Sequence, residues 1–524
     1  MPERVPTLQE IDAWLRQAAP TAQLTSDSRR VAPGDVFFAY VGDADGRSYI
    51  ADAVERGAAA VVYEAAGYAW PAQIDVPHLA VTDLKTKAGE IAAAWYGQPD
   101  QGMLTVAVTG TNGKTSCAYW LGIALSRLAG AGQSGLAGVI GTLGVGTFQG
   151  GKPQGFDVTG YTTPDAVLLQ RSLSRLAKAR VGALAIEASS IGLAQGRMNG
   201  MHVDVALLTN FTRDHLDFHG DMQTYEDAKR QLFQWPGLKH AVVNLDDSMG
   251  VRLLPLLAQR QVPVIGYAIA DEPKDSKGAT PAPAGSPPHT TEVATLLASH
   301  VRSSHAGTVF QVDSPFGSGQ VKIQLVGRFN VSNVLGIMGV LLAQGLAWDT
   351  VVGAAAALTA APGRMQQFGG PDVPLIVIDY AHTPDALDKT LSTLRQVATQ
   401  RGGQLWCVFG CGGDRDPGKR PQMGQIAEQA DHVVLTSDNP RSEDPQAIID
   451  QIRAGMSRVE PVQLPDRAGA ILWAIRHATK TDVVLLAGKG HEAYQEIAGK
   501  KLPFLDADHV ALALAARSTM MGGA

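Results

Sequence analysis

The 524-residue sequence has little cysteine, no long apolar run and no excess of positive charge. Its three cysteines, Cys117, Cys407 and Cys411, are too few for a disulfide framework, and the last two lack partners for a four-ligand zinc site. No stretch approaches the roughly 18 consecutive apolar residues of a membrane-spanning helix. With 44 Lys and Arg against 50 Asp and Glu, the net charge is −6, which disfavours nucleic acid or an anionic membrane as the main partner. We therefore expect a cytoplasmic protein without membrane insertion.

Glycine, in contrast, is abundant, with 57 residues or about 11%, against a usual value of ~7%. The excess fits either a loose chain or many turns that approach phosphate groups. The segment 271–290 is rich in Pro, Ser and Ala, and we expect it to be a mobile surface insertion without chemistry. Residues 130–151 hold further glycines whose turns the sequence does not assign.

Short apolar runs alternate with helical patterns along the whole chain, which is typical of α/β proteins. Turn clusters suggest three segments, 1–100, 101–358 and 359–524, in line with about 150 residues per domain. The last segment has continuous apolar runs, typical of parallel strands that are buried on both faces. We therefore predict an N-terminal α/β domain, a central parallel-sheet domain with a phosphate loop, and a C-terminal Rossmann-like domain.

The central segment opens with a strand, a glycine-rich turn and a helix. The turn contains Gly113-Lys114-Thr115, but Val108 occupies the place of the first glycine of the usual phosphate-loop pattern, and Gly110 supplies the flexibility. Backbone N–H groups at a helix start bind phosphate, the lysine pairs with the outer phosphates, and the threonine can bind Mg²⁺. We expect a nucleoside triphosphate to bind Gly110, Thr111, Asn112, Gly113, Lys114, Thr115 and Ser116.

Two candidate metal ligands follow apolar runs further along the chain. Glu187 ends one run, and His215 follows another within TNFTRDHLDFHG. A carboxylate at such a position suits Mg²⁺, although a residue of this kind, taken alone, more often has an ordinary polar or capping role. Lys229, judged by the sequence alone, is typical of a solvated helix lysine.

The chain resembles the Mur ligases, a family of ATP-dependent amide-forming ligases. The similarity begins at GTNGKT (110–115), which is also similar to the loop of folylpolyglutamate synthetases, and continues in family order through GRFNVSN (327–333), PGR (362–364) and DYAHTP (379–384). It implies that ATP and Mg²⁺ are required. The family usually has a glutamate two positions after the arginine of PGR. This chain has Gln366 there, so we assign that position no role.

The same resemblance implies roles for individual residues. The implied catalytic residues are Lys114, Glu187, His215 and Lys229. The implied metal ligands are Thr115, Glu187, His215 and Lys229, the last as a carbamate. The further implied ATP contacts are Asn333, Arg364 and Asp379.

The two substrate ends also resemble family motifs. Hydroxyls, amides and an arginine suit an anionic, polyhydroxylated substrate, and the resemblance implies UDP-N-acetylmuramoyl-L-Ala-D-Glu. The residues implied for it are Ser26, Ser28, Thr162, Thr163, Ser189, Gln195 and Arg197. Ile191 stands where the family often has histidine, so no role is transferred to it.

Asp438-Asn439-Pro440-Arg441 resembles the motif of the diaminopimelate-adding members. Diaminopimelate differs from lysine chiefly by a second carboxylate, which an arginine can bind bidentately. Lysine would leave that arginine unpaired, which favours strong discrimination. The residues implied for meso-diaminopimelate are Arg415, Asp438, Asn439, Pro440, Arg441, Gly488 and Glu492.

The resemblance thus implies a monomeric ligase that adds meso-diaminopimelate to the D-Glu of the UDP-dipeptide through an acyl phosphate, in peptidoglycan precursor synthesis. A lysine-adding or other sibling ligase, or a folylpolyglutamate synthetase, is the nearest alternative. From another class, the chain could be an ATP-binding regulatory switch. Arg441 disfavours the lysine adder, and the N-terminal segment disfavours the folate enzyme. The sequence does not identify the base that deprotonates the incoming amine.

Overall fold

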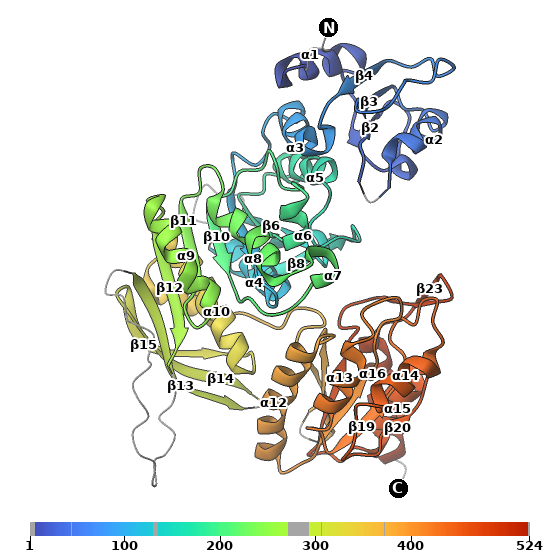
Figure 1. Ribbon diagram of the computed structural model, residues 1–524. Helices are drawn as coiled ribbons and strands as arrows, with labels where there is room; N and C mark the ends of the chain where they lie inside the picture. Colours follow the sequence, from blue (N-terminus) through green and yellow to red (C-terminus); the bar gives the residue numbers. More distant parts are fainter. Residues whose placement is uncertain are drawn as a thin grey trace.

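The computed structural model describes residues 6–42, 44–128, 135–270, 293–304, 306–370 and 372–521. The predicted insertion at 271–290 lies outside these residues. The described chain forms three bodies that follow one another from the N-terminus to the C-terminus, each with its own main sheet (Figure 1). We call them the N-terminal, central and C-terminal bodies.

The N-terminal body contains a parallel four-stranded sheet with helices beside it. Its elements are α1 (Leu8–Ala18), β1 (Leu24–Thr25), β2 (Val36–Ala39), α2 (Ile50–Glu55), β3 (Ala60–Glu64), β4 (His78–Val81) and α3 (Leu84–Trp95). Helix α1 begins where it does because Thr7 and Glu10 form a capping box, in which each side chain bonds the backbone N–H of the other. Both central strands are buried along their whole length, as their apolar sequences predict.

The central body contains an eleven-stranded sheet in the order β15-β14-β13-β12-β11-β10-β5-β9-β6-β7-β8. The strands from β13 to β6 in this order run parallel, and antiparallel hairpins extend both ends. The strands are β5 (Leu104–Thr109), β6 (Leu136–Gly141), β7 (Gly144–Gln149), β8 (Lys152–Asp157), β9 (Ala183–Glu187), β10 (Val205–Leu208), β11 (His240–Asn244), β12 (Val264–Ile269), β13 (Ala294–Ser304), β14 (Gly307–Ser314) and β15 (Gly317–Ile323).

Helices cover both faces of the central sheet, so its parallel strands are buried on both sides. One face packs against α4 (Lys114–Arg127), α10 (Arg328–Ala343) and α11 (Trp348–Ala356). The other packs against α5 (Ala166–Lys178) and α9 (Ser248–Gln259). The short helices α6 (Ser190–Ala194) and α7 (Leu216–His219) and helix α8 (Met222–Arg230) follow strand ends near the phosphate loop.

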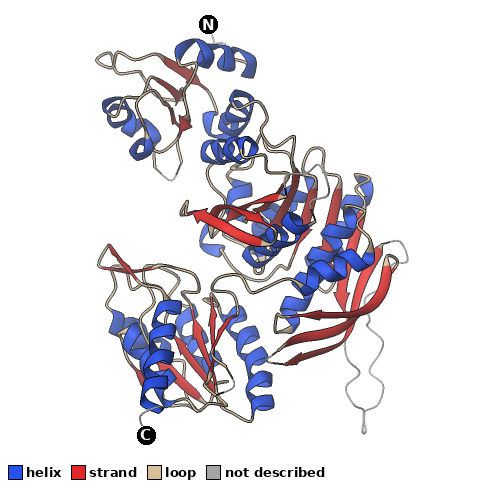
Figure 2. Ribbon diagram, turned by 180° about the vertical axis from the view of Figure 1, so that it is seen from behind, coloured by secondary structure: helices blue, strands red, loops and turns tan. Residues whose placement is uncertain are grey.

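The C-terminal body contains a six-stranded sheet in the order β16-β17-β21-β18-β19-β20, parallel except for β16. Its elements are β16 (Gln366–Phe368), β17 (Leu375–Asp379), α12 (Pro384–Arg401), β18 (Leu405–Phe409), α13 (Lys419–Ala427), β19 (His432–Leu435), α14 (Pro445–Arg453), β20 (Val462–Gln463), α15 (Arg467–His477), β21 (Val483–Ala487) and α16 (Asp506–Met521). Helices lie on both faces of this sheet (Figure 2). A hairpin of β22 (Tyr494–Ile497) and β23 (Lys500–Pro503) follows β21.

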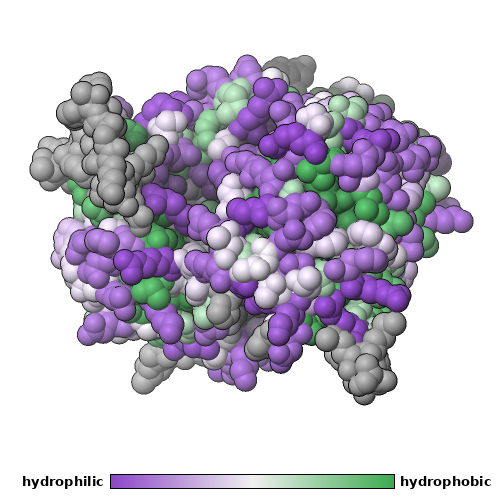
Figure 3. Space-filling view, turned by 90° about the horizontal axis from the view of Figure 1, so that it is seen from below, coloured by the Kyte–Doolittle hydropathy of each residue, from purple (hydrophilic) through white to green (hydrophobic). Residues whose placement is uncertain are grey.

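The predicted three-part α/β fold is confirmed, with parallel sheets in all three bodies. Among the described helices, none is both long and apolar enough to cross a bilayer. The face seen in Figure 3 is largely hydrophilic with smaller apolar areas between. In each parallel sheet, the loops at the carboxyl ends of the strands are the expected place for a ligand.

Candidate active site

The phosphate loop joins the end of β5 to the start of α4. Gly110 (φ +150°) and Gly113 (φ +86°) adopt conformations that favour glycine, and both lack room for a side chain. A Cβ at Gly110 would collide with Thr209, and one at Gly113 would lie 2.7 Å from Oδ1 of Asn333. Lys114 Nζ donates to the carbonyl oxygens of Gly110 and Thr111, at 2.9 Å each, and desolvation lowers its pKa. The loop therefore presents a cation and a helix start to an anion.

Glu187 lies beside this loop at the end of β9, with only 1% of its surface exposed. Oε2 accepts hydrogen bonds from the hydroxyls of Thr115 (2.9 Å) and Thr142 (3.2 Å), and Oε1 accepts from the backbone N–H of Thr142 (2.8 Å). Burial raises the pKa of Glu187, while Lys114 opposes that rise. The structure thus joins Thr115 and Glu187 as predicted and adds Thr142, which the sequence analysis missed.

Lys229 is fully buried in α8, which contradicts the surface position that its sequence alone suggests. Its Nζ donates to the carbonyl oxygen of Gly110 at 2.8 Å and lies 4.6 Å from the centre of the Tyr225 ring. Burial, with a contribution from Lys114, lowers the pKa of Lys229 well below its usual value. The amine is therefore favoured in its neutral, nucleophilic form.

His215 lies in the same region, with its ring 6.1 Å from that of Tyr225. It has a positive φ of 53°, which is uncommon for a residue other than glycine. Nε2 is 3.5 Å from a carboxylate oxygen of Asp214, and burial is the largest cause that lowers the histidine pKa. The four predicted catalytic residues therefore surround one end of the phosphate loop.

A cavity of about 210 Å³ lies between the central and C-terminal bodies. Among the predicted ATP residues, Asn112, Gly113, Ser116, Asn333, Arg364 and Asp379 line it. The sequence analysis missed other lining residues, among them Asn210, Phe329, Tyr380, His382 and Lys389. Tyr380 and His382 belong to the DYAHTP segment. The resemblance identified this segment as a family motif but implied no role for these two side chains.

Arg364 connects the C-terminal body to the phosphate loop. Its Nη2 donates to the Thr115 hydroxyl at 3.2 Å, and its guanidinium lies 4.3 Å from the centre of the Tyr380 ring. Within the described part of the chain, Arg364 Nε is buried without a hydrogen-bond partner. A second contact across the same boundary runs from Asn112 Nδ2 to Asp385 Oδ2, at 3.3 Å.

Most residues predicted for the UDP-dipeptide form one network beside Glu187. Thr163 donates to the Glu187 carbonyl oxygen (2.7 Å) and lies 2.9 Å from the Ser189 hydroxyl. Arg197 donates to the Thr163 carbonyl oxygen (2.8 Å) and to Gln195 Oε1 (2.9 and 2.7 Å).

The remaining residues of this set lie on either side of that network. The Thr162 hydroxyl is 3.1 Å from that of Thr142, which leads toward Glu187. Ser26 of the N-terminal body reaches the central body by donating to Asp165 at 2.7 Å. Ser28 lies apart, because its hydroxyl bonds Asp52 of α2, so the structure does not bring it to the others.

The residues predicted for the amino acid meet at the carboxyl ends of β18, β19 and β21. Arg441 has a positive φ of 52°, and its Nη1 donates to the Gly413 carbonyl oxygen at 2.6 Å. A Cβ built on Gly412 would lie 3.0 Å from Arg441 Nη1 and 3.7 Å from Arg415 Cγ, so the two arginines flank this glycine. Arg441 Nε is 3.6 Å from a carboxylate oxygen of Glu496 in β22.

The other half of this pocket is a closed polar cluster. Asn439 donates to Glu492 at 2.8 Å, and the fully buried Lys489 lies 3.1 Å from both Asn439 Oδ1 and Glu492 Oε2. Gly488 adopts a φ of +108°, and a Cβ there would collide with the buried carboxylate of Asp438. The sequence analysis missed Lys489, although its place between two glycines of AGKGHE is a signal for a lysine held inside a loop.

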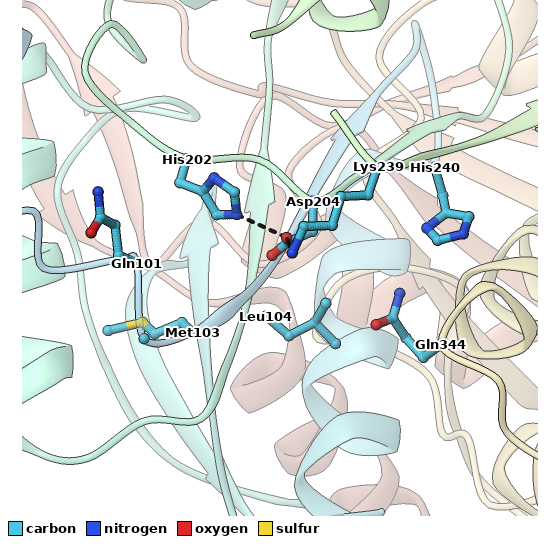
Figure 4. A pocket seen from close by; sticks show the side chains of 9 residues that line it. Gln101, Met103, Leu104, His202, Asp204, Lys239, His240 and Gln344 are labelled. Carbon is cyan, nitrogen blue, oxygen red and sulfur yellow. Dashed lines mark hydrogen bonds and ion pairs between the residues drawn. The ribbon is translucent and has the colours of Figure 1, made fainter. Parts of the chain in front are cut away.

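A second cavity, of about 240 Å³, lies at the opposite, amino-terminal edge of the central sheet. Figure 4 shows His202, Asp204, Lys239 and His240 around it. There Asp204 already pairs with His202 (2.8 Å) and Lys239 (2.7 Å). No predicted site residue lines this cavity, and the phosphate loop starts at the other end of β5. We therefore place the active site at the smaller cavity.

A phosphate loop contacted by an arginine from a separate α/β body indicates a nucleotide-binding protein whose site lies between two bodies. Comparison with known families identifies the class more closely. The Mur ligase middle domain matches residues 108–341, the Mur ligase glutamate ligase domain matches 363–490, and the catalytic domain of the Mur ligase family matches 21–96. The chain belongs to the Mur ligase family, and the prediction of a ligase is confirmed.

Similar proteins extend over nearly the whole chain. A protein of Janthinobacterium sp. (strain Marseille), named UDP-N-acetylmuramoyl-L-alanyl-D-glutamate--2,6-diaminopimelate ligase, is 64% identical over 509 residues, 96% of each chain. A protein of the same name from Ralstonia nicotianae is 51% identical and covers 96% of this chain and 95% of its own. A solved structure of that name is 35% identical, covers 95% of both chains and has a TM-score of 0.62.

Proposed function

We propose that the chain joins meso-diaminopimelate to the D-Glu of UDP-N-acetylmuramoyl-L-Ala-D-Glu with hydrolysis of ATP to ADP and phosphate, in peptidoglycan precursor synthesis. The observation that carries this proposal is the pair Arg415 and Arg441 in a pocket whose loop packs against Gly363. A Cβ built on Gly490, two residues before Glu492, would lie 2.9 Å from the Gly363 carbonyl oxygen. The amino-acid pocket therefore adjoins the segment that contacts the phosphate loop. The names of the full-length relatives support the same substrates.

In the first half-reaction, the D-Glu γ-carboxylate attacks the γ-phosphorus of ATP, which gives an acyl phosphate and ADP. Both reactants are anions, so the chain must supply positive charge where they meet. Lys114 and Arg364 do so from two bodies, and the backbone N–H groups at the start of α4 bind the phosphates. In the second half-reaction, the amine attacks the acyl carbon and phosphate leaves.

The oxygen ligands beside the phosphate loop fit Mg²⁺. Thr115 and Glu187 offer a hydroxyl and a carboxylate, and Mg²⁺ is usually held by one or two carboxylates together with substrate phosphates. Among the described residues, no three His, Cys, Asp or Glu side chains form a metal site of their own, which agrees with a site that the nucleotide completes. When bound, Mg²⁺ supplies neutralisation of the triphosphate charge.

Lys229 and His215 are proposed to complete the metal site. A neutral, buried lysine amine can add carbon dioxide, and the carbamate carries the negative charge that a metal ligand needs. Burial lowers the pKa of Lys229, which favours the neutral amine, and its Nζ lies 2.8 Å from the Gly110 carbonyl oxygen beside the phosphate loop. His215 adds a nitrogen donor on the same side.

For the UDP-dipeptide, we propose the network of Thr162, Thr163, Ser189, Gln195 and Arg197 as the peptide-side contacts. Arg197 is the cation of this group, and the N-terminal body adds Ser26 across the boundary. Ser28 is retained as a contact for the uridine diphosphate end. We propose residues 1–100, 101–358 and 359–524 as the functional domains for the UDP-sugar, ATP and amino acid, and a monomer as the active form.

A single assay tests this function against the alternatives. The purified chain is supplied with ATP, Mg²⁺ and the UDP-dipeptide, with meso-diaminopimelate, lysine or neither, and both phosphate release and the tripeptide product are measured. We expect rapid phosphate release and product only with meso-diaminopimelate. Faster reaction with lysine would identify a lysine-adding sibling, and ATP turnover that ignores both substrates would identify a switch.

A further inference from the structure

The loop after β21 places a histidine between the amino-acid pocket and the residues that contact the phosphate loop. His491 precedes Glu492, and its ring lies 5.4 Å from the ring of Tyr380. Tyr380 in turn lies against the guanidinium of Arg364, which donates to Thr115 of the phosphate loop. Through Tyr380 and Arg364, the imidazole therefore connects the Glu492 side of the amino-acid pocket to the phosphate loop.

The two ring nitrogens of His491 have different surroundings. The backbone of Thr142 in the central body accepts a hydrogen bond from the imidazole. Nδ1 is buried and has no hydrogen-bond partner within the described part of the chain. We assign the Thr142 contact and the proton to Nε2, and the free lone pair to Nδ1. Buried polar atoms without a partner are rare, so Nδ1 calls for a ligand group that donates a hydrogen.

The surroundings of His491 keep its imidazole unprotonated when no substrate is bound. Burial is the largest cause that lowers the pKa of His491 to about 4, and the cations Arg364 and Lys489 act in the same direction. Glu492 and the Thr142 backbone oppose them. The imidazole is therefore neutral at pH 7, before an anionic substrate enters.

We propose that His491 is the general base that takes a proton from the ammonium group of the incoming amino acid. This inference rests on the proposed function, because it concerns the second half of the same reaction. An N–H bond of the ammonium breaks, its proton goes to Nδ1, and the freed electron pair attacks the acyl carbon. The C–O bond to phosphate then breaks, and the second amine proton leaves with the phosphate.

Two nucleophiles separate this role from a structural one. Diaminopimelate enters as an ammonium and needs a base, whereas hydroxylamine is largely unprotonated at neutral pH and needs none. We compare His491→Asn with the wild type, each with ATP, Mg²⁺ and the UDP-dipeptide. The matched control is His477→Asn, an exposed histidine on α15 of the same body.

We expect His491→Asn to lower the kcat for diaminopimelate by about 10²- to 10⁴-fold, the usual contribution of a general base. Hydroxamate formation with hydroxylamine should stay within about twofold of wild type. The remaining diaminopimelate rate should rise roughly tenfold per pH unit, as the free amine fraction does, while the wild-type rate levels off. His477→Asn should match wild type in every measurement.

Equal losses with both nucleophiles would overturn the proposal, because they would indicate a positioning or structural role. An unchanged diaminopimelate rate would overturn it as well. If the unfolding temperature of His491→Asn is lower than that of the wild type, His491→Gln serves as the second variant. Failure of the proposed function looks different: the wild type itself would form no tripeptide product from the UDP-dipeptide and meso-diaminopimelate.

Discussion

The phosphate loop and the amino-acid pocket both contain buried or half-buried cations, but they satisfy them differently. Lys114 donates to backbone carbonyl oxygens of the loop, and within the described part of the chain no carboxylate is bonded to it. In the amino-acid pocket, Lys489 pairs with Glu492 and Arg441 lies beside Glu496. In the first region the Lys114 ammonium therefore has no direct carboxylate partner and can pair with a polyanion, whereas the second region is balanced for a substrate that carries both signs. Net charge, at −6 for the chain, gives no hint of either arrangement.

The largest expected loss of activity follows from a change in the phosphate loop. Lys114→Met removes the cation that faces the phosphates, so ATP turnover should fall on the order of 10³-fold, the cost of losing a preorganised charge at a reacting group. ADP formation with both other substrates present is the measurement. Lys480→Met, on the surface of the C-terminal body, is the control. Loss of less than about tenfold would contradict the idea that Lys114 provides the charge for phosphate transfer.

In the amino-acid pocket, removal of the Arg441 cation should affect the reaction with meso-diaminopimelate only. Arg441→Ala should lower kcat/KM for meso-diaminopimelate by about 10²-fold, since a charge-assisted pair to the second carboxylate is lost. The rate with lysine should change little, so the ratio between the two amino acids is the readout. Arg453→Ala on α14, an exposed arginine, is the control. An equal loss in ATP binding would show that the pocket assignment is wrong.

The stability of the loop that contains Asp414 and Arg415 should depend on pH. The Arg420 guanidinium, followed by the Asp414 N–H, lowers the pKa of Glu443 from 4.5 to about 2. A carboxyl group whose pKa is lower in the folded than in the unfolded chain stabilises the fold at pH values above its unfolded pKa. This stabilisation is lost as the pH falls from about 4.5 to about 2. Glu443→Gln should therefore lower the free energy of unfolding at pH 7 by about 1–2 kcal/mol.

Denaturant unfolding at several pH values measures this effect. The gap between wild type and Glu443→Gln should narrow as pH falls through that window. Glu460→Gln, in a mostly exposed pair with Arg453, should cost far less at every pH. A gap that is independent of pH would rule out the charge of Glu443 as its cause.

The smallest effect is expected at Glu496. Its 3.6 Å contact with Arg441 is partly exposed to solvent, and such pairs contribute at most about 1 kcal/mol. Glu496→Gln should therefore change KM for diaminopimelate by less than about fivefold. Steady-state kinetics at low and high salt test this, with Glu496→Asp as the conservative comparison. A change as large as that of Arg441→Ala would mean that Glu496, and not the substrate, is the main partner of this arginine.

Local patterns predicted the contiguous parts of the molecule well. GTNGKT forms a strand–loop–helix unit because its signal lies within eight residues, and short apolar runs of the N-terminal segment form the buried strands β2 and β3. Part of the glycine-rich segment 130–151 forms β6 and β7, where Gly138 and Gly146 leave room for neighbouring side chains. The sequence could not show this, because the neighbours are distant in the chain.

Contacts between segments that are distant in the sequence were the least predictable. Nothing in YEDAK indicates that α8 packs behind the phosphate loop and buries Lys229, and nothing in AGKGHE shows which side chain faces Thr142. The resemblance located these motifs, but packing decides which residue of a motif is buried, neutral or paired.

The contacts Arg364–Thr115 and Asn112–Asp385 have a thermodynamic consequence. Each links a nucleotide-binding segment of the central body to the body that binds the amino acid. A ligand that brings these bodies together therefore lowers the free energy that the second ligand must spend on closure. By linkage, ATP and diaminopimelate should each increase the affinity for the other by the same factor. The reactive acyl phosphate would then be present mostly in enzyme molecules that have also bound the amino acid that accepts the acyl group.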